Sequence, residues 1–158
     1  MITQTAEYAL RAAADLATHH GRPRTSQQMA RATHVPPDYL SKVMKELVRA
    51  GIVRSQRGVN GGFSLLRDPD DLPVYDVINA VNPIQRIREC PLGLRAHARG
   101  NLCPLHRLLD DAMEKIEAAF KGVTLGQLAR QAKQHGKNGD PLSRPLSLTV
   151  DRAMRAAS

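Results

Sequence analysis

The sequence predicts a mainly α-helical fold that carries one small β-hairpin and a long helix near its C-terminal end. Apolar residues recur at helical spacing in several segments. An Asn60-Gly61 pair, which is a strong turn signal, lies between two short strand-like runs. A wide apolar stripe occupies residues 104–120. With 158 residues, the chain can bury a core without a disulfide.

Two helices are expected in the first part of the chain. The first ends before Gly21 and Pro23 and buries one apolar face, made of Ile2, Ala6, Ala9, Leu10, Ala13, Leu16 and Ala17. Thr25 opens the second, because Gln28 three residues later completes a capping-box pattern. We expect this second helix to run to about Thr33.

A third helix is expected from Pro37 to Ala50, after a short turn over residues 34–36. Proline suits the first turn of a helix, and Gly51 suits its end. Its inner stripe is Leu40, Val43, Met44 and Leu47, and its outer face is Tyr39, Ser41, Lys42, Lys45 and Arg49. Two helices joined by a tight turn, the second with a basic outer face, indicate a helix-turn-helix, although an ordinary helical hairpin has a similar pattern.

A basic β-hairpin is expected directly after the third helix. Its strand candidates are residues 52–54 and 63–66, with the Asn-Gly turn signal between them. A hairpin in this place is typical of the wing of a winged helix-turn-helix. Such a wing can place Arg57 in or beside a DNA minor groove, where the potential is most negative. The alternative is that Arg57 is an ordinary exposed turn charge.

The charge distribution favours a nucleic-acid partner. The net charge is +8, and residues 22–62 hold eight basic side chains against two acidic ones, whereas residues 68–117 hold nine acids against six bases. Aromatic residues make up only 3% of the chain, which leaves little to stack on unpaired bases and favours duplex DNA. The candidate DNA contacts are Ser26, Gln27, Pro37, Tyr39, Ser41, Lys42, Lys45, Arg49, Arg57 and Asn60.

The rest of the chain divides into a middle part and a tail. A short helix over 74–81 precedes an irregular stretch over 82–102, and a final short helix is expected over 124–131. Between them, the helix over 104–120 carries an apolar stripe that needs cover, either from the chain's own core or from a second subunit. We expect a DNA-binding domain over 1–68, a sensor loop with a dimerisation helix over 69–132, and a basic, disordered tail over 133–158.

Four segments resemble one family, the IscR- and NsrR-type winged helix-turn-helix regulators known as the Rrf2 family. They are residues 53–65 in the wing, 5–11, 37–43 and 76–81, and the similarity covers about residues 1–132. The resemblance implies a homodimer built through the long helix and a roughly palindromic operator in double-stranded DNA. The dimer stripe is then Leu105, Leu108, Leu109, Ile116 and Phe120.

The resemblance also implies an iron–sulfur cluster, of the 2Fe-2S or 4Fe-4S type, that several family members hold on three cysteines. Cys90 and Cys103 resemble the outer two, the middle cysteine is absent, and His106 matches a histidine of some members. His97 is the only other good ligand between the cysteines, and Glu7 matches a place from which a carboxylate is borrowed from the partner subunit. The alternatives are that His97 is an exposed loop histidine, that His106 is a histidine packed in its helix, and that Glu7 is a solvent-facing acid on its helix.

These observations favour a regulator of transcription, expected to be a repressor, whose operator affinity follows a redox-, nitric-oxide- or iron-sensitive centre. The alternatives are sensing through free thiols or haem, or cysteines with no sensing role. No phosphate-cradling glycine loop, nucleophile elbow or HExxH motif is present, so an enzyme is not expected. The absence of a secretion signal and of a long apolar run predicts a cytoplasmic protein with no membrane partner.

Overall fold

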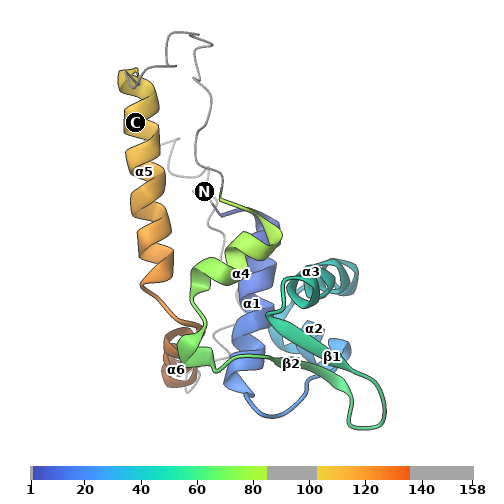
Figure 1. The fold of residues 1–158 in the computed structure, drawn as a ribbon. Helices are drawn as coiled ribbons and strands as arrows, with labels where there is room; N and C mark the ends of the chain where they lie inside the picture. The colour runs from blue at the N-terminus through green and yellow to red at the C-terminus, as the bar shows by residue number, and fades with distance from the viewer. Residues whose placement is uncertain (1, 85–102, 136–158) are drawn as a thin grey trace, which may run out of the picture.

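The computed structural model describes residues 2–84 and 103–135, and its centre is helix α1 (Gln4–Thr18) (Figure 1). Nine of the fifteen residues of α1 are buried, more than one helix face can supply, because α3, α4 and α6 all pack against it. Many of the buried positions are alanines, which let neighbouring helices approach closely. The side-chain oxygen of Thr3 accepts a hydrogen bond from the backbone N–H of Ala6 and caps the helix.

Helices α2 (Ser26–Thr33) and α3 (Pro37–Arg49) form the predicted helix-turn-helix. Both halves of the capping box between Thr25 and Gln28 are formed, at 2.9 and 3.2 Å. The chain turns at His34, whose φ of 53° lies in the left-handed region, and α3 begins directly on Pro37. The predicted inner stripe of α3 (Leu40, Val43, Met44 and Leu47) is fully buried in the core.

The predicted hairpin is formed by strands β1 (Val53–Gln56) and β2 (Gly62–Leu65), paired antiparallel. Its details differ from the expectation. β1 begins one residue later than expected and extends to Gln56, so the connecting loop has five residues. The backbone N–H of Gly61 donates to the carbonyl of Gly58 at 2.9 Å, which centres the turn on Val59 and Asn60 rather than on the Asn-Gly pair.

Beyond the hairpin, the 3₁₀ turn η1 (Pro69–Asp71) leads into α4 (Val74–Val81), the predicted short helix. Helix α5 (Pro104–Lys121) extends away from the other helices as a rod (Figure 1). Its lower end is joined to α4, because the Lys121 ammonium lies 4.7 Å from the centre of the Tyr75 ring. A hydrogen bond from Lys121 to Glu117, at 2.6 Å, raises the pKa of Lys121.

Helix α6 (Leu125–His135) folds back onto α1 and is longer than expected. The sequence predicts a helix over 124–131 and a tail from residue 133, so the observed helix passes both boundaries. Thr124 and Gln127 form a reciprocal cap at its start, and Leu125 and Ala129 are buried in the core. Gly136 directly follows the last residue of the helix, so the sequence does carry a stop signal at this end, which the expectation of a tail from residue 133 did not use. The tail over 136–158 lies outside the described residues.

One residue of the expected dimer stripe also packs against the chain's own core. Phe120 is grouped by sequence with the dimer stripe, but it is half-buried and packs against the core cluster. The reason is its place in the last turn of α5, where the chain returns toward α1. Within residues 2–84 and 103–135, no helix is long and apolar enough to cross a membrane.

Candidate DNA-binding face and cysteine segment

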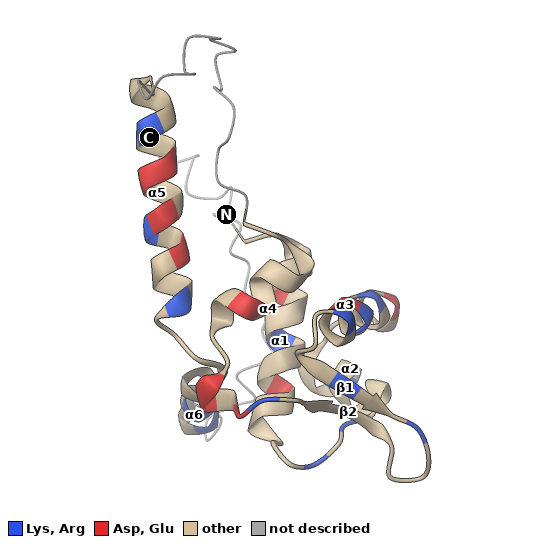
Figure 2. Cartoon of the chain, in the orientation of Figure 1, with Lys and Arg blue, Asp and Glu red and all other residues tan. Residues whose placement is uncertain are grey.

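The ten residues predicted to contact DNA are all exposed, and they lie on α2, α3 and the hairpin loop. Blue segments for Lys and Arg mark α3 and the hairpin in Figure 2, whereas most of the red segments lie on α5 and near α4 and α6. The charge asymmetry along the sequence is therefore also an asymmetry in space. The face made by α2, α3 and the hairpin has the sign that a phosphate backbone requires.

The first turns of α3 hold an aromatic and a basic side chain in contact. The Lys42 ammonium lies 5.7 Å from the centre of the Tyr39 ring, which packs edge-on against Tyr8 of α1 at 5.6 Å between ring centres. Ser41 donates a hydrogen bond to the carbonyl of Pro37 at 2.9 Å. The Tyr39 ring therefore contacts both α1, through Tyr8, and the Lys42 ammonium, on an exposed part of the face.

A hollow of about 490 Å³ lies between α3 and the hairpin. Four predicted contacts line it, namely Ser26, Ser41, Lys45 and Arg49. Sequence reasoning missed the other lining residues, which are Val48 on the outer side of α3, Ser55 and Phe63 on the hairpin, and Met44, assigned only to the core. The exposure of Val48, at 37%, is an irregularity on a polar helix face that could have indicated an apolar patch.

The hairpin loop carries the remaining two predicted contacts, Arg57 and Asn60, both exposed. The backbone of this loop needs a glycine at position 61, where the chain passes close to Gln56. A Cβ on Gly61 would lie 2.4 Å from the carbonyl oxygen of Gln56, so a side chain cannot be accommodated without moving the loop. Nearer the base, Arg54 donates to Ser64 across the strands at 2.9 Å. The loop is therefore a defined tip that carries the charge of Arg57.

Only part of the predicted metal-ligand set falls within the described residues. Cys103 is half-buried and caps α5, its sulfur accepting a hydrogen bond from the backbone N–H of His106 at 3.3 Å, and His106 is buried one turn into the helix. Cys90 and His97 lie outside the described residues. Among the described residues, no group of three His, Cys, Asp or Glu side chains is placed to hold a metal ion.

Glu7, the predicted borrowed ligand, forms an ion pair within its own helix. Its carboxylate accepts from Arg11 at 2.7 Å, and the buried Arg11 also donates to the carbonyl of Thr33 at 3.3 Å. Glu7 therefore orients an arginine that holds the helix-turn-helix turn against α1. Its side chain is 20% exposed, so it is not fully enclosed by the chain.

A family model described as an iron-dependent transcriptional regulator, Rrf2, matches residues 2–131. This chain belongs to the Rrf2 family. A predicted HTH-type transcriptional regulator of Aquifex aeolicus is 31% identical over 137 residues, which cover 85% of this chain and 95% of the relative. The HTH-type transcriptional regulator IscR of Aliivibrio salmonicida is 30% identical, over 80% of this chain and 76% of its own length.

The solved structure of IscR from T. potens is similar in fold, with a TM-score of 0.70 at 24% identity, over 85% of this chain and 90% of that one. The family assignment and the winged helix-turn-helix architecture are therefore confirmed. As an Rrf2-family member, the chain is a DNA-binding transcriptional regulator and not an enzyme.

The donor types around the start of α5 are those that an iron centre binds. Cys103 supplies a sulfur at the N-cap of α5, and the imidazole of His106 lies three residues further on, in the first turn of the same helix. Thiolate and imidazole are both found as ligands of iron–sulfur clusters. The described residues thus contribute two donors of the right chemistry from one helix end.

Proposed function

We propose that this Rrf2-family protein is a cytoplasmic, homodimeric repressor whose affinity for a roughly palindromic DNA operator is set by an iron–sulfur centre. The observation that carries the DNA-binding part is the exposed basic face shared by α3 and the hairpin. In this arrangement α3 enters the major groove, with Lys42, Lys45 and Arg49 near phosphates or base edges. Ser26 and Gln27, at the start of α2, face the phosphate backbone.

Replacement of Arg57 by Ala is expected to weaken operator binding by about 1–3 kcal/mol, because Arg57 is the cation at the exposed hairpin tip and would lie in a minor groove. The measurement is titration of a duplex by fluorescence anisotropy. Arg130→Ala is the matched control, because Arg130 pairs with Asp70 on the α6 side of the molecule. Operator binding by the Arg57→Ala protein at wild-type strength would refute the wing contact.

The apolar face of α5 supports the dimer. Leu105, Leu108 and Ile116 are 38%, 66% and 40% exposed, although they follow one another at helical spacing on one side of the rod. Large aliphatic side chains grouped on a projecting helix are typical of a surface that another subunit covers. Two copies joined there would present two α3 helices to successive major grooves, about 34 Å apart.

The proposed centre is held by Cys90 and Cys103, with His106 or His97 in place of the absent middle cysteine and Glu7 of the partner subunit as a further ligand. When bound, such a centre would supply redox chemistry and reactivity toward nitric oxide or oxygen. Two features of the chain support this proposal. Cys103 starts α5, and Glu7 is linked through Arg11 to the turn before α3. A ligand set divided between these points would connect the dimer helix with the helix-turn-helix.

Substitution of either cysteine is expected to remove iron. Protein purified without oxygen should contain iron and sulfide and absorb visible light, whereas Cys90→Ala and Cys103→Ala should each lose the absorption and change operator affinity. Cys103→Ser is the matched variant, because a serine oxygen retains the N-cap of α5 but is a poor cluster ligand. A cluster lost in Cys103→Ser while α5 stays helical identifies ligation rather than helix fraying.

The remaining ligands are separated by further variants. His97→Ala and His106→Ala test the two replacements for the middle cysteine. Glu7→Gln retains an oxygen that can accept from Arg11 while removing the charged ligand. Iron-free wild-type protein, or cysteine variants that keep both the spectrum and the response to nitric oxide or oxygen, would reject the cluster. Haem absorption or a response that depends on the thiols alone would instead identify the corresponding alternative centre.

A further inference from the structure

Arg24 lies where three parts of the DNA-binding unit meet. It directly precedes Thr25, which caps α2, and its backbone pairs with Phe63 of β2. The N–H of Arg24 donates to the Phe63 carbonyl at 2.9 Å, and the N–H of Phe63 donates to the Arg24 carbonyl at 2.8 Å. The loop-side part of β2 is thus hydrogen-bonded to the segment that begins the helix-turn-helix, whereas the base of the hairpin, where Val53 faces Leu65, lies two residues further along β2.

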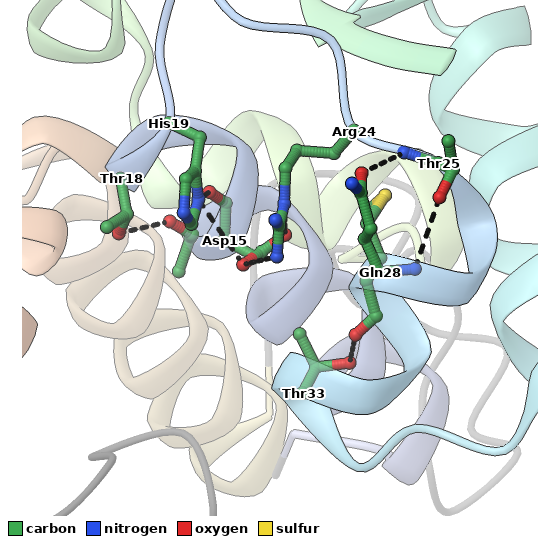
Figure 3. Close-up of polar contacts among 9 residues, drawn as sticks. Asp15, Thr18, His19, Arg24, Thr25, Gln28 and Thr33 are labelled. Atoms are coloured by element: carbon green, nitrogen blue, oxygen red, sulfur yellow. Dashed lines mark hydrogen bonds and ion pairs between the residues drawn. The ribbon is translucent and has the colours of Figure 1, made fainter.

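The Arg24 side chain anchors this junction to α1. Its Nε and Nη2 donate to the two carboxylate oxygens of Asp15, at 3.1 and 3.2 Å (Figure 3). The Asp15 side chain is 2% exposed and that of Arg24 is 18% exposed. A guanidinium bound through two nitrogens to one carboxylate has a restricted direction as well as a restricted distance. His19 lies beside the same carboxylate, with Nδ1 3.5 Å from an Asp15 oxygen.

Close packing at the start of β2, next to the loop, leaves little freedom for a different arrangement. A Cβ on Gly62 would lie 2.6 Å from the carbonyl oxygen of Arg24, and the φ of Gly62 is +145°. β2 therefore approaches the Arg24 backbone more closely than any other residue would allow. The junction combines a pair of backbone hydrogen bonds, a glycine contact and a buried ion pair.

A buried ion pair is a poor source of net stability, because desolvation offsets most of its attraction. What it supplies here is a fixed geometry close to the hairpin loop. Asn60 is three residues from Phe63, or ~10 Å along an extended strand. A rotation of about 10° about the Arg24–Phe63 contact would move the tip by ~2 Å, enough to break a hydrogen bond between an arginine and DNA.

We propose that Asp15 and Arg24 are positioning residues for DNA binding, and that their ion pair holds the hairpin at the angle at which its tip engages the duplex. The inference rests on the proposed contact of Arg57 with DNA. It assigns a role in operator affinity to two residues that need not touch the operator. Loss of the pair should leave α3 able to bind while removing the contribution of the hairpin tip.

The test is a double-mutant cycle on a fixed operator duplex. Asp15→Asn with Arg24→Gln removes both charges and retains polar groups of similar size. In the wild type, Arg57→Ala should weaken binding by about tenfold or more. In the Asn/Gln background it should weaken binding by less than about twofold, because the tip is no longer placed to engage. An equal factor in both backgrounds would overturn the proposal.

Amide hydrogen exchange without DNA supplies the second readout. In the Asn/Gln protein, the amides of Arg24 and Phe63 should exchange about tenfold faster or more, while those between β1 and β2 stay protected. Val77→Ala, a core substitution in α4, is the stability control. It should change neither the relative exchange rates of the Arg24 and Phe63 amides nor the fold-loss of operator affinity caused by Arg57→Ala. If the Asp15→Asn, Arg24→Gln protein does not fold, Arg24→Lys replaces it in the double-mutant cycle. Lysine keeps the positive charge but cannot bind both Asp15 oxygens through two nitrogens.

The two proposals fail in different ways. If Arg57→Ala is without effect in the wild type, the proposed contact of Arg57 with DNA is wrong. The positioning role of the ion pair is then tested by the Asp15→Asn, Arg24→Gln protein alone. Faster exchange of the two bridging amides together with weaker operator binding would sustain it, with another hairpin residue making the contact. Unchanged exchange, or unchanged operator binding, would overturn it.

Discussion

The affinity of the protein for its operator is expected to fall by ~10³-fold or more when monovalent salt rises from about 50 to 200 mM. The physical reason is the release of counterions from DNA phosphates that basic side chains neutralise. Lys42, Lys45, Arg49 and Arg57 are all exposed on one face, and two subunits double their number. If about 6–10 phosphates are contacted, the logarithm of the affinity should fall linearly with the logarithm of salt, with a slope of roughly −5 to −9.

Lys45 gives this expectation a residue-level test. Lys45 lies exposed beside the hollow between α3 and the hairpin, so Lys45→Ala should reduce the salt slope by about 1 for each copy in the complex. Lys115→Ala is the control, because Lys115 is exposed on α5, away from that face, and should not alter the slope. Binding measured across the salt range on duplexes with and without the operator separates phosphate contacts from base contacts. A salt-independent affinity would contradict the basic face as the DNA-binding surface.

The helix-turn-helix was predictable from sequence because each of its features has a local cause. The capping box at Thr25 and Gln28, the proline at position 37 and the four-residue inner stripe of α3 act within one or two helical turns. The same holds for α4, whose predicted bounds match the structure. The ten candidate DNA contacts were found to be exposed on one part of the fold because helical periodicity already separates outer from inner positions.

Features that depend on contacts distant in sequence were not predictable in this way. The pairing of Arg24 with Phe63 involves a single residue of an irregular segment, which has no periodicity to detect. Leu125 and Ala129 of α6 are buried because α6 packs against α1, and Phe120 packs against the core because of where α5 ends. The apolar part of the hollow, with Val48 and Phe63, joins a helix to a hairpin, so no single segment indicates it.

The final prediction concerns the apolar face of α5. Ile116→Asp is expected to convert a dimer into a monomer, because it would place an unpaired carboxylate in the seam between two subunits, where desolvation of a charge is costly. Ile116 is 40% exposed in the single chain, so the substitution should leave the fold of that chain intact. Helical content measured by circular dichroism should therefore stay close to that of the wild type.

Operator affinity should fall together with the dimer. When two DNA-binding units are joined, binding of the second becomes intramolecular, which adds a factor of about 10²–10⁴ to the affinity. Ile116→Asp should lose that factor on a palindromic duplex but not on a single half-site. Leu109→Asp, on the same face, should behave alike, whereas Glu114→Lys, on the charged opposite side of α5, is the control. Light scattering at micromolar concentration checks the mass, and a wild-type monomer or a dimeric Ile116→Asp protein would show that α5 is not the interface.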